Sequence, residues 1–403
     1  MLKSKLEKSF KLFLAVLVLI PINALAAKVF VPFKENRKYG YMDLDKNVIV
    51  KPAFDRTYIF KEEMGRFRYK DKYGYFNKSG QIVIKNVYSE AWDFKEGLAK
   101  IREGVRCGFI DKTGKQVIKV IGEDCSEFTN GFAIIKRMHK YGYINKDGAE
   151  IFEPVLTKAE PFENGMALIH IGSKYGLINE TGNYILPPAY DFIGVSDGEY
   201  IRARIGGLWY IYNKKGEKLH TTSHIITTDC ENGRFGFAKY ETDMVQYKGY
   251  INPEGEEIVS PKYRWVGRFS GGLGVVNHEE KYGVINKDGQ FVVEPQYQST
   301  LGKYVEDRLG VKKDGKWGFI DPRGAKTVDF KYEDIQDYAN GYAMVSQGFF
   351  KWGAVNMAGD LIVPMKYEIV LAEPEFLVAI IGELRAFYTF DGELLYKEVL
   401  PKE

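Results

Sequence analysis

The residues best suited to chemistry in this chain are two histidines and a cysteine that follow one another closely. His220 and His224 are four residues apart, and Cys230 comes six residues later. A His-x3-His spacing can bind a metal ion from one face of a helix, and a cysteine can add a soft ligand. The hydroxyl residues at 221–223 favour an elongated loop instead. We therefore expect no metal site here, although the stretch remains the best candidate for a function specific to one part of the chain.

Acidic pairs could supply general acid and base catalysis. Glu256–Glu257 and Glu279–Glu280 are examples, but side chains of this kind usually lie in solvated turns, and no pattern pairs them with a nucleophile. The chain has no Walker loop, no Gly-x-Ser-x-Gly motif and no His-Glu-x-x-His motif. The sequence therefore predicts no enzyme activity, no catalytic, cofactor-binding or metal-binding residue, and no cofactor.

The three cysteines are too few to form a disulfide framework. Cys107 and Cys125 could form one bond in an oxidising compartment, and Cys230 would then be left over. The sequence leaves open whether that bond forms.

The first 26 residues have the pattern of a secretory signal peptide. Four lysines precede an uninterrupted apolar run at 12–20, and Ala24-Leu25-Ala26 supplies the small residues read by a signal peptidase. The apolar run is well short of the roughly 20 residues that a membrane-spanning helix needs. We expect cleavage after Ala26, an exported protein that is periplasmic or secreted, and no integral membrane span in the mature chain, residues 27–403.

The mature chain is electrically balanced. The whole sequence contains 57 basic and 54 acidic residues, and the predicted signal peptide contains four lysines and one glutamate. Residues 27–403 therefore carry no net charge. Since nucleic-acid binding depends on neutralising phosphates with basic side chains, the sequence argues against a nucleic-acid partner.

A motif of Lys, an aromatic residue and Gly recurs through the mature chain, and it organises everything else. Aligning on the third motif residue, which we call the anchor, gives 11 units, most of them 34 residues apart. The anchors are Gly40, Gly74, Gly108, Gly142, Gly176, Tyr210, Gly249, Gly283, Gly318, Gly353 and Ala386. A fixed period of this size indicates an array of supersecondary units that bury apolar surface against their neighbours.

Each unit carries the signature of a β-hairpin. A short apolar strand leads from the anchor into a four-residue turn that begins with Asn or Asp and ends with Gly, as at Asn77–Gly80 and Asn286–Gly289. These residues suit a type I turn followed by a residue with positive φ. A second signature, Gly-x-Ala, lies upstream of the next motif, as at Gly97-Leu98-Ala99. Its alternating pattern predicts a third, half-buried strand.

These units predict an all-β chain of about 11 three-stranded units, in one of two arrangements. The first is an open curved solenoid, and the alternative is propeller-like closure. Three strands and 11 units favour the open form, because propellers typically have four to eight blades of four strands. An irregular unit with an insertion is expected at about 210–248. The terminal unit, at about 384–396, is degenerate, because Arg385-Ala386 replaces aromatic-Gly, as a polar cap of an open array would.

The motifs resemble those of the bacterial WG, or KWG, repeat family. Lys-Trp-Gly and Lys-Tyr-Gly, the Asn/Asp-Lys-x-Gly turn and the Gly-x-Ala strand all match, over about residues 28–396. Cys107 and Lys248 depart from the pattern by replacing the aromatic residue. The resemblance implies a β-rich, often exported array that mediates interactions, and it implies no catalytic residues.

Two functions remain open from the sequence. The first is a non-catalytic scaffold that binds another protein in the cell envelope or outside the cell. The alternative is binding of glycan or cell wall through the aromatic residues of the repeats. A site confined to the irregular unit, about 217–248, is a third and weaker hypothesis.

Overall fold

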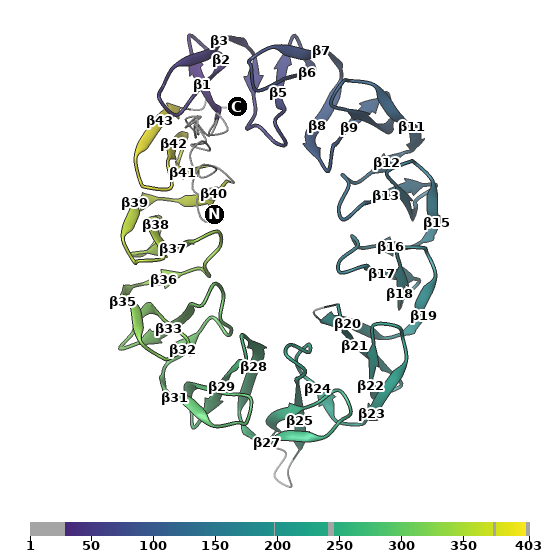
Figure 1. Cartoon of the computed structure of the whole chain (residues 1–403), viewed down its shortest axis with the longest axis vertical. Coiled ribbons are helices and arrows are strands. Elements are labelled where there is room, and N and C mark those ends of the chain that lie inside the picture. Colours follow the sequence, from purple (N-terminus) through teal and green to yellow (C-terminus); the bar gives the residue numbers. More distant parts are fainter. Residues whose placement is uncertain (1–28, 197, 241–245, 374–375, 400–403) are drawn as a thin grey trace, which may run out of the picture.

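The computed structural model describes residues 29–196, 198–240, 246–373 and 376–399, and these residues contain β-strands and no α-helix. Their strands form 11 small antiparallel sheets. The sheets follow one another around a closed oval ring, so that the last lies beside the first (Figure 1). The fold is therefore a β-propeller, and we number its blades 1 to 11 in chain order. The predicted signal peptide, 1–26, lies outside the described residues.

The strand bounds follow one scheme around the ring. Blades 1 to 4 contain β1 (Val31–Glu35), β2 (Lys38–Met42) and β3 (Val48–Phe54); β4 (Arg56–Thr57), β5 (Gly65–Tyr69), β6 (Lys72–Phe76) and β7 (Ile82–Tyr88); β8 (Glu90–Lys95), β9 (Leu98–Glu103), β10 (Arg106–Asp111) and β11 (Gln116–Gly122); β12 (Asp124–Cys125), β13 (Phe132–Arg137), β14 (Lys140–Asn145) and β15 (Glu150–Leu156). Blades 5 to 8 contain β16 (Lys158–Ala159), β17 (Met166–Ile171), β18 (Lys174–Asn179) and β19 (Tyr184–Tyr190); β20 (Phe192–Ser196), β21 (Tyr200–Ile205), β22 (Leu208–Asn213) and β23 (Lys218–Thr222); β24 (Ile225–Ile226), β25 (Phe235–Tyr240), β26 (Gln246–Ile251) and β27 (Glu257–Tyr263); β28 (Trp265–Ser270), β29 (Leu273–His278), β30 (Lys281–Ile285) and β31 (Phe291–Tyr297). Blades 9 to 11 contain β32 (Ser299–Thr300), β33 (Leu309–Lys313), β34 (Lys316–Ile320) and β35 (Lys326–Tyr332); β36 (Asp334–Ile335), β37 (Tyr342–Ser346), β38 (Trp352–Asn356) and β39 (Leu361–Tyr367); β40 (Ile369–Ala372), β41 (Leu377–Ile381), β42 (Leu384–Tyr388) and β43 (Leu394–Val399).

The structure confirms the all-β prediction and the 11 repeats, and it selects the closed arrangement. The open solenoid, which the strand count favoured, is wrong. Ten blades have four strands rather than three. The missed strand is the first of each blade, and it is only two residues long in blades 2, 4, 5, 7, 9 and 10. Two residues are too few to give an alternating pattern, so in these six blades the sequence could not reveal the first strand.

The anchor glycine is required by a bulge between the third and fourth strands. In blade 1, Tyr39 pairs with Phe54 but Tyr41 pairs with Val50, so the register shifts at Gly40. A Cβ atom on Gly40 would lie 2.2 Å from the carbonyl oxygen of Val50, and no side chain fits there. The two units without an anchor glycine, in blades 6 and 11, pair regularly through this position.

The anchor strand also ties each blade to the next. Tyr41, one residue after the anchor, is fully buried and donates a hydrogen bond of 2.6 Å to the carbonyl oxygen of Tyr58 in blade 2. The motif lysine reaches the same neighbour, because Lys38 Nζ lies 2.6 Å from Asp55 Oδ1. Equivalent bonds recur at Tyr75, Tyr143 and Tyr250 and at Lys174 and Lys316. Three of the motif lysines, Lys38, Lys174 and Lys316, therefore connect neighbouring blades.

The predicted turns lie between the third and fourth strands. Asn77 Oδ1 accepts hydrogen bonds from the backbone N–H groups of Ser79 and Gln81, at 2.9 and 3.0 Å. Gly80 follows with a φ of 74°. An asparagine side chain that bonds the backbone ahead of it, followed by a glycine in the left-handed region, is what the sequence predicted.

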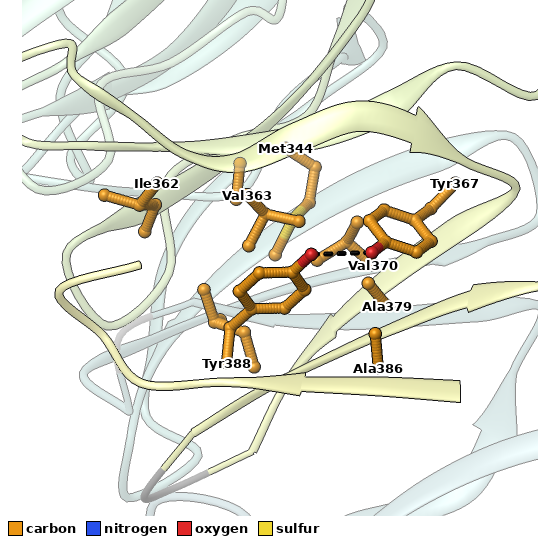
Figure 2. Packing of buried hydrophobic residues seen from close by; sticks show 10 residues of the cluster. Met344, Ile362, Val363, Tyr367, Val370, Ala379, Ala386 and Tyr388 are labelled. Atoms are coloured by element: carbon orange, nitrogen blue, oxygen red, sulfur yellow. Dashed lines mark hydrogen bonds between the residues drawn. The ribbon is translucent and has the colours of Figure 1, made fainter. Parts of the chain in front are cut away.

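The core consists of separate apolar clusters, each between two neighbouring blades, rather than one central core. Figure 2 shows the cluster between blades 10 and 11, where Tyr367 and Tyr388 face one another with their hydroxyl oxygens 2.6 Å apart. Val363 and Ala379 pack beside them and are fully buried. Stability in such an array comes from nearest-neighbour interfaces.

The ring closes through the same kind of interface. Val31 and Phe33 of blade 1 share a buried cluster with Phe376 and Phe387 of blade 11. Tyr396, in β43, accepts a hydrogen bond from the Lys34 N–H at 2.9 Å and donates one to the Lys34 carbonyl oxygen at 3.0 Å.

One ion pair also spans this seam, between blades 2 and 11. Lys61 Nζ lies 2.8 Å from Glu373 Oε2. Blade 11 is therefore no polar cap, contrary to what its degenerate motif suggested. Ala386 is fully buried, and Glu398, opposite Arg385, is only 5% exposed.

Candidate interaction surface

The structure does not gather the histidines and the cysteine singled out in the sequence into one group. His220 lies in β23, and its imidazole occupies the place where a Cβ atom on Gly255 would sit, 2.2 Å away. The His224 ring lies 6.2 Å from the Phe237 ring, and the Cys230 thiol is buried in the core of blades 6 and 7. In the described ranges, no group of three or more His, Cys, Asp or Glu side chains is placed to hold a metal ion.

The insertion of blade 7 lies elsewhere than the elongated loop expected near His220–Cys230. Gly233 and Phe235 keep the regular offsets of 23 and 25 residues from the anchor Tyr210, so the extra residues come later. Phe235 pairs with Ile251 in the usual register. The five extra residues therefore fall between Phe235 and the anchor Gly249 in the sequence. Residues 241–245, between β25 and β26, lie outside the described residues. The spacing of Gly233 and Phe235 from Tyr210 already indicated, in the sequence, that the insertion follows Phe235.

Cys107 and Cys125 form a disulfide bond, which the sequence had left open. Cys107 stands at the aromatic position of blade 3, in β10, and Cys125 lies in the first strand of blade 4. Both side chains are buried in the cluster between the two blades. The bond thus links neighbouring blades at the point where one motif lacks its aromatic ring.

The largest groove that we describe runs across blades 6 to 9 and has a volume of about 490 Å³. It is lined by Arg202, Thr227, Thr228, Asp229, Lys248, Trp265, Val266, Gly267, Arg268, Leu301, Gly302 and Lys303. Several of these residues belong to the first strands or to the segments after them. In Figure 1 those strands, such as β24 and β28, lie on the inner side of the ring. We call this feature the blade 6–9 groove.

An ion-pair network forms one wall of the groove. Asp229 accepts a hydrogen bond from Arg202 Nε at 2.6 Å and one from Arg268 Nη2 at 2.5 Å. Arg202 also donates from Nη1 to the Ile226 carbonyl oxygen at 2.8 Å. Arg202 and Asp229 are only 13% and 15% exposed. Two arginines thus hold the single carboxylate among the lining residues by charge-assisted hydrogen bonds.

The remaining cations make the groove positive. Lys248 and Lys303 also line it, and within the described part of the chain their ammonium groups form no hydrogen bond or ion pair. Four basic side chains therefore face one carboxylate, although the mature chain as a whole is neutral. A concave site that concentrates one sign of charge attracts ligands of the other sign.

Two departures from the repeat produce this site. Lys248 stands at the motif position that is aromatic in most units, so a cation replaces a ring. Gly236, opposite Tyr250, stands where Arg66 opposes Tyr75 in blade 2 and Arg202 opposes Ile211 in blade 6. The sequence showed the first departure, Lys248. Its contribution to a groove depends on which side chains the neighbouring blades place beside it, and this follows only from the structure. The Trp265 ring completes the wall and packs edge-on against Tyr282.

Among the described residues, no helix is long and apolar enough to cross a membrane.

Comparison with known proteins identifies the repeats. The family described as WG containing repeat matches eight segments, 39–73, 73–104, 108–137, 141–175, 175–209, 249–282, 282–317 and 317–348. Together these segments cover more than half of the chain. A comparison with curated proteins gives no match.

Solved structures show only distant likeness. The Kluyveromyces lactis protein Hsv2p is 13% identical, with 61% of this chain and 99% of that chain covered and a TM-score of 0.37. The crystal structure of the eukaryotic initiation factor is 9% identical, with 93% of this chain and 96% of that chain covered and a TM-score of 0.42. BamB from Moraxella catarrhalis is 10% identical, with 76% and 97% covered and a TM-score of 0.34. These scores carry no argument about function, whereas the repeat matches are specific: the chain belongs to the WG-repeat family.

Proposed function

We propose that this protein is an exported, non-catalytic scaffold that binds another protein through an acidic segment of that partner. The observation that carries the proposal is the positive charge of the blade 6–9 groove. Lys248 and Lys303 line the groove with ammonium groups that form no hydrogen bond or ion pair within the described residues, and Arg268 is 41% exposed. Basic side chains in this arrangement recognise carboxylates by charge-assisted hydrogen bonds.

The shape of the groove supports a peptide segment. The groove has a volume of about 490 Å³, within the range of about 300–1,000 Å³ that is usual for drug-sized ligands, so it suits a segment of a few residues. Trp265 is half-buried against Tyr282, and arginine and tryptophan are both enriched at binding hot spots. Complementary charge chiefly raises the association rate and selects the partner.

The glycan alternative depends on aromatic rings with an open face. The motif aromatics are half-buried, as at Tyr39, Tyr73 and Trp317, and Trp209 is buried. Side chains in this state offer less surface for stacking on a sugar than a binding platform needs. We therefore place protein binding first.

Affinity capture with residues 27–403 from envelope and culture fractions tests the proposal. We expect an enriched protein to bind the purified chain directly. Combined Lys248→Glu, Arg268→Glu and Lys303→Glu substitutions should weaken that binding at least about tenfold, and higher salt should weaken it in the unchanged chain.

The matched control reverses three exposed lysines of fourth strands, Lys85, Lys331 and Lys366. The control protein should bind as the unchanged chain does. Equal losses in both proteins would reject the groove as the binding site. Retention of wall polysaccharide, without any protein, would favour the glycan alternative.

A further inference from the structure

The seam that closes the ring contains a second pocket, with a volume of about 210 Å³. Blade 11 supplies one side of it, and blades 1 and 2 supply the other. Leu371, Val378, Ile380 and Phe387 form its apolar lining. The volume is below the range of about 300–1,000 Å³ that is usual for drug-sized ligands, so a molecule that fits must be small.

Opposite charges converge in this pocket as an ion pair without a hydrogen bond. Glu398 is 5% exposed, and its Oε2 atom has no hydrogen-bond partner in the described chain. Its Oε1 atom lies 3.8 Å from Arg385 Nη1, which is too far for a hydrogen bond. The buried Nε atom of Arg385 also lacks a partner. The pocket therefore presents one acceptor and one donor, both buried.

Other polar groups surround the pair. Tyr39 and Arg56 line the same pocket. Burial raises the pKa of Glu398, and the charges of Arg385, Lys34 and Arg56 oppose that rise. Burial, followed by the nearby charge of Glu398, also raises the pKa of Tyr39. Perturbed ionisable groups in a small apolar pocket are typical of binding sites.

The pair is specific to this seam. Arg385 occupies the motif position that holds an aromatic ring in most units, and Glu398 is its direct partner in the ladder between β42 and β43. At the opposite interface of the same blade, the buried hydroxyl groups of Tyr367 and Tyr388 bond one another. Buried polar groups without partners are costly, so their presence here suggests that a ligand supplies the partners.

We propose that the pocket of the closing seam binds a free α-amino acid with an apolar side chain. The ammonium group donates to Glu398 Oε2, and the carboxylate accepts from Arg385 Nε. The side chain lies among Leu371, Ile380 and Phe387. A zwitterion matches the acceptor and the donor together, whereas a purely cationic or purely anionic molecule matches only one. Pro32, Tyr39 and Arg56 of blades 1 and 2 form the opposite lining of the pocket. A ligand that fills the pocket therefore contacts both sides of the seam, and its binding stabilises the closed ring.

Calorimetry and thermal unfolding of residues 27–403 with leucine or phenylalanine test this proposal. We expect saturable binding, and an unfolding temperature that rises with ligand concentration. Leucinamide lacks the carboxylate and N-acetyl-leucine lacks the ammonium group, and each should bind at least about tenfold more weakly.

Two variants locate the site. Glu398→Gln keeps the shape of the side chain but removes its charge, and it should weaken leucine binding at least about tenfold. Asp337→Asn is the control, because Asp337 is also a partly buried carboxyl with an unpartnered oxygen and a raised pKa, but it does not line this pocket. The control should bind leucine normally.

Three results would overturn the proposal: no binding of any apolar amino acid at millimolar concentration, equal binding of leucine and its two blocked derivatives, or unchanged binding by a folded Glu398→Gln protein. None of these results depends on a protein partner. The proposed scaffold function and this ligand site can therefore fail separately.

Discussion

Blade 11 has two interfaces, and their comparison shows what holds this ring together. Toward blade 10, which precedes it in the chain, its polar groups are paired, with the Tyr367 and Tyr388 hydroxyls 2.6 Å apart (Figure 2). Toward blade 1, its apolar side chains pack equally well, but Glu398 and Arg385 stay 3.8 Å apart. Closure therefore combines apolar packing with the Tyr396–Lys34 hydrogen bonds and the Lys61–Glu373 ion pair, whereas Glu398 and Arg385 form no hydrogen bond with one another.

The two faces alternate between Phe376 and Leu377, the residue at which β41 begins, so these neighbouring residues test the two interfaces separately. Phe376 is buried in the closing seam, and Leu377 is buried against blade 10. We expect Phe376→Ala to cost about 3–5 kcal/mol and Leu377→Ala about 2–5 kcal/mol in the free energy of unfolding. Hydrogen exchange should then rise in β1 and β2 for the first variant, and in β38 and β39 for the second. Identical exchange patterns would show that the seams do not act separately.

The tyrosine pair provides the next largest effect, confined to the interface with blade 10. Tyr388→Phe leaves the buried Tyr367 hydroxyl without its partner, and we expect a loss of about 1–3 kcal/mol. Replacing both tyrosines with phenylalanine should recover most of that loss, because no orphaned hydroxyl remains. Denaturant unfolding of the single and double variants measures both values. A double variant less stable than either single one would contradict the account.

At the closing seam, replacing the buried carboxylate of Glu398 should raise the stability of the protein rather than lower it. The raised pKa of Glu398 means that the folded chain holds this proton more tightly than the unfolded chain does. The raised pKa therefore lowers the free energy of unfolding. This loss of stability is absent below the ordinary carboxyl pKa of 4.5, grows as the pH rises to the pKa of the folded state, and is constant above it. Without ligand, Glu398→Gln should therefore stabilise the protein by about 1–2 kcal/mol at pH 8 and by much less at pH 4. Unfolding temperatures at the two pH values measure this difference, and a destabilised variant at pH 8 would contradict it.

The smallest effect is expected for the exposed ion pair of the closing seam. Lys61 and Glu373 are 34% and 25% exposed, so solvent screens their attraction. Lys61→Met should cost about 0.2–1 kcal/mol, as should Lys38→Met at the ordinary interface between blades 1 and 2. A cost of several kcal/mol for Lys61→Met alone, in denaturant unfolding, would show that closure depends on charge.

The sequence predicted what single residues impose on the backbone. Asn77 and Gly80 determine a turn, and Gly40 marks a bulge. The spacing at which these residue types recur gives the number of blades. Closure could not be predicted, because it depends on the small rotation between successive blades, which no single residue determines. Arg385 was taken for an exposed cap for the same reason: only the closed ring brings blade 1 against it.

The sequence alone indicated part of one candidate site and none of the other. Lys248 stood out as a departure from the motif, but the groove also needs Asp229, Arg268 and Lys303, which belong to three blades. Their proximity follows from the order of the blades around the ring. The Glu398–Arg385 pair gave no signal, because thirteen residues separate its members, and buried and exposed charges look alike in a sequence.

Zero-length cross-linking with a carbodiimide tests the central claim, that blade 11 closes the ring, most directly. Lys61 Nζ lies 2.8 Å from Glu373 Oε2, although 312 residues separate them. Lys38–Asp55 and Lys174–Asp191, both at 2.6 Å, are internal controls within the array. We predict that mass spectrometry of the monomeric product finds all three cross-links. If both controls form and Lys61–Glu373 does not, the array is open and the account of its closing seam is wrong.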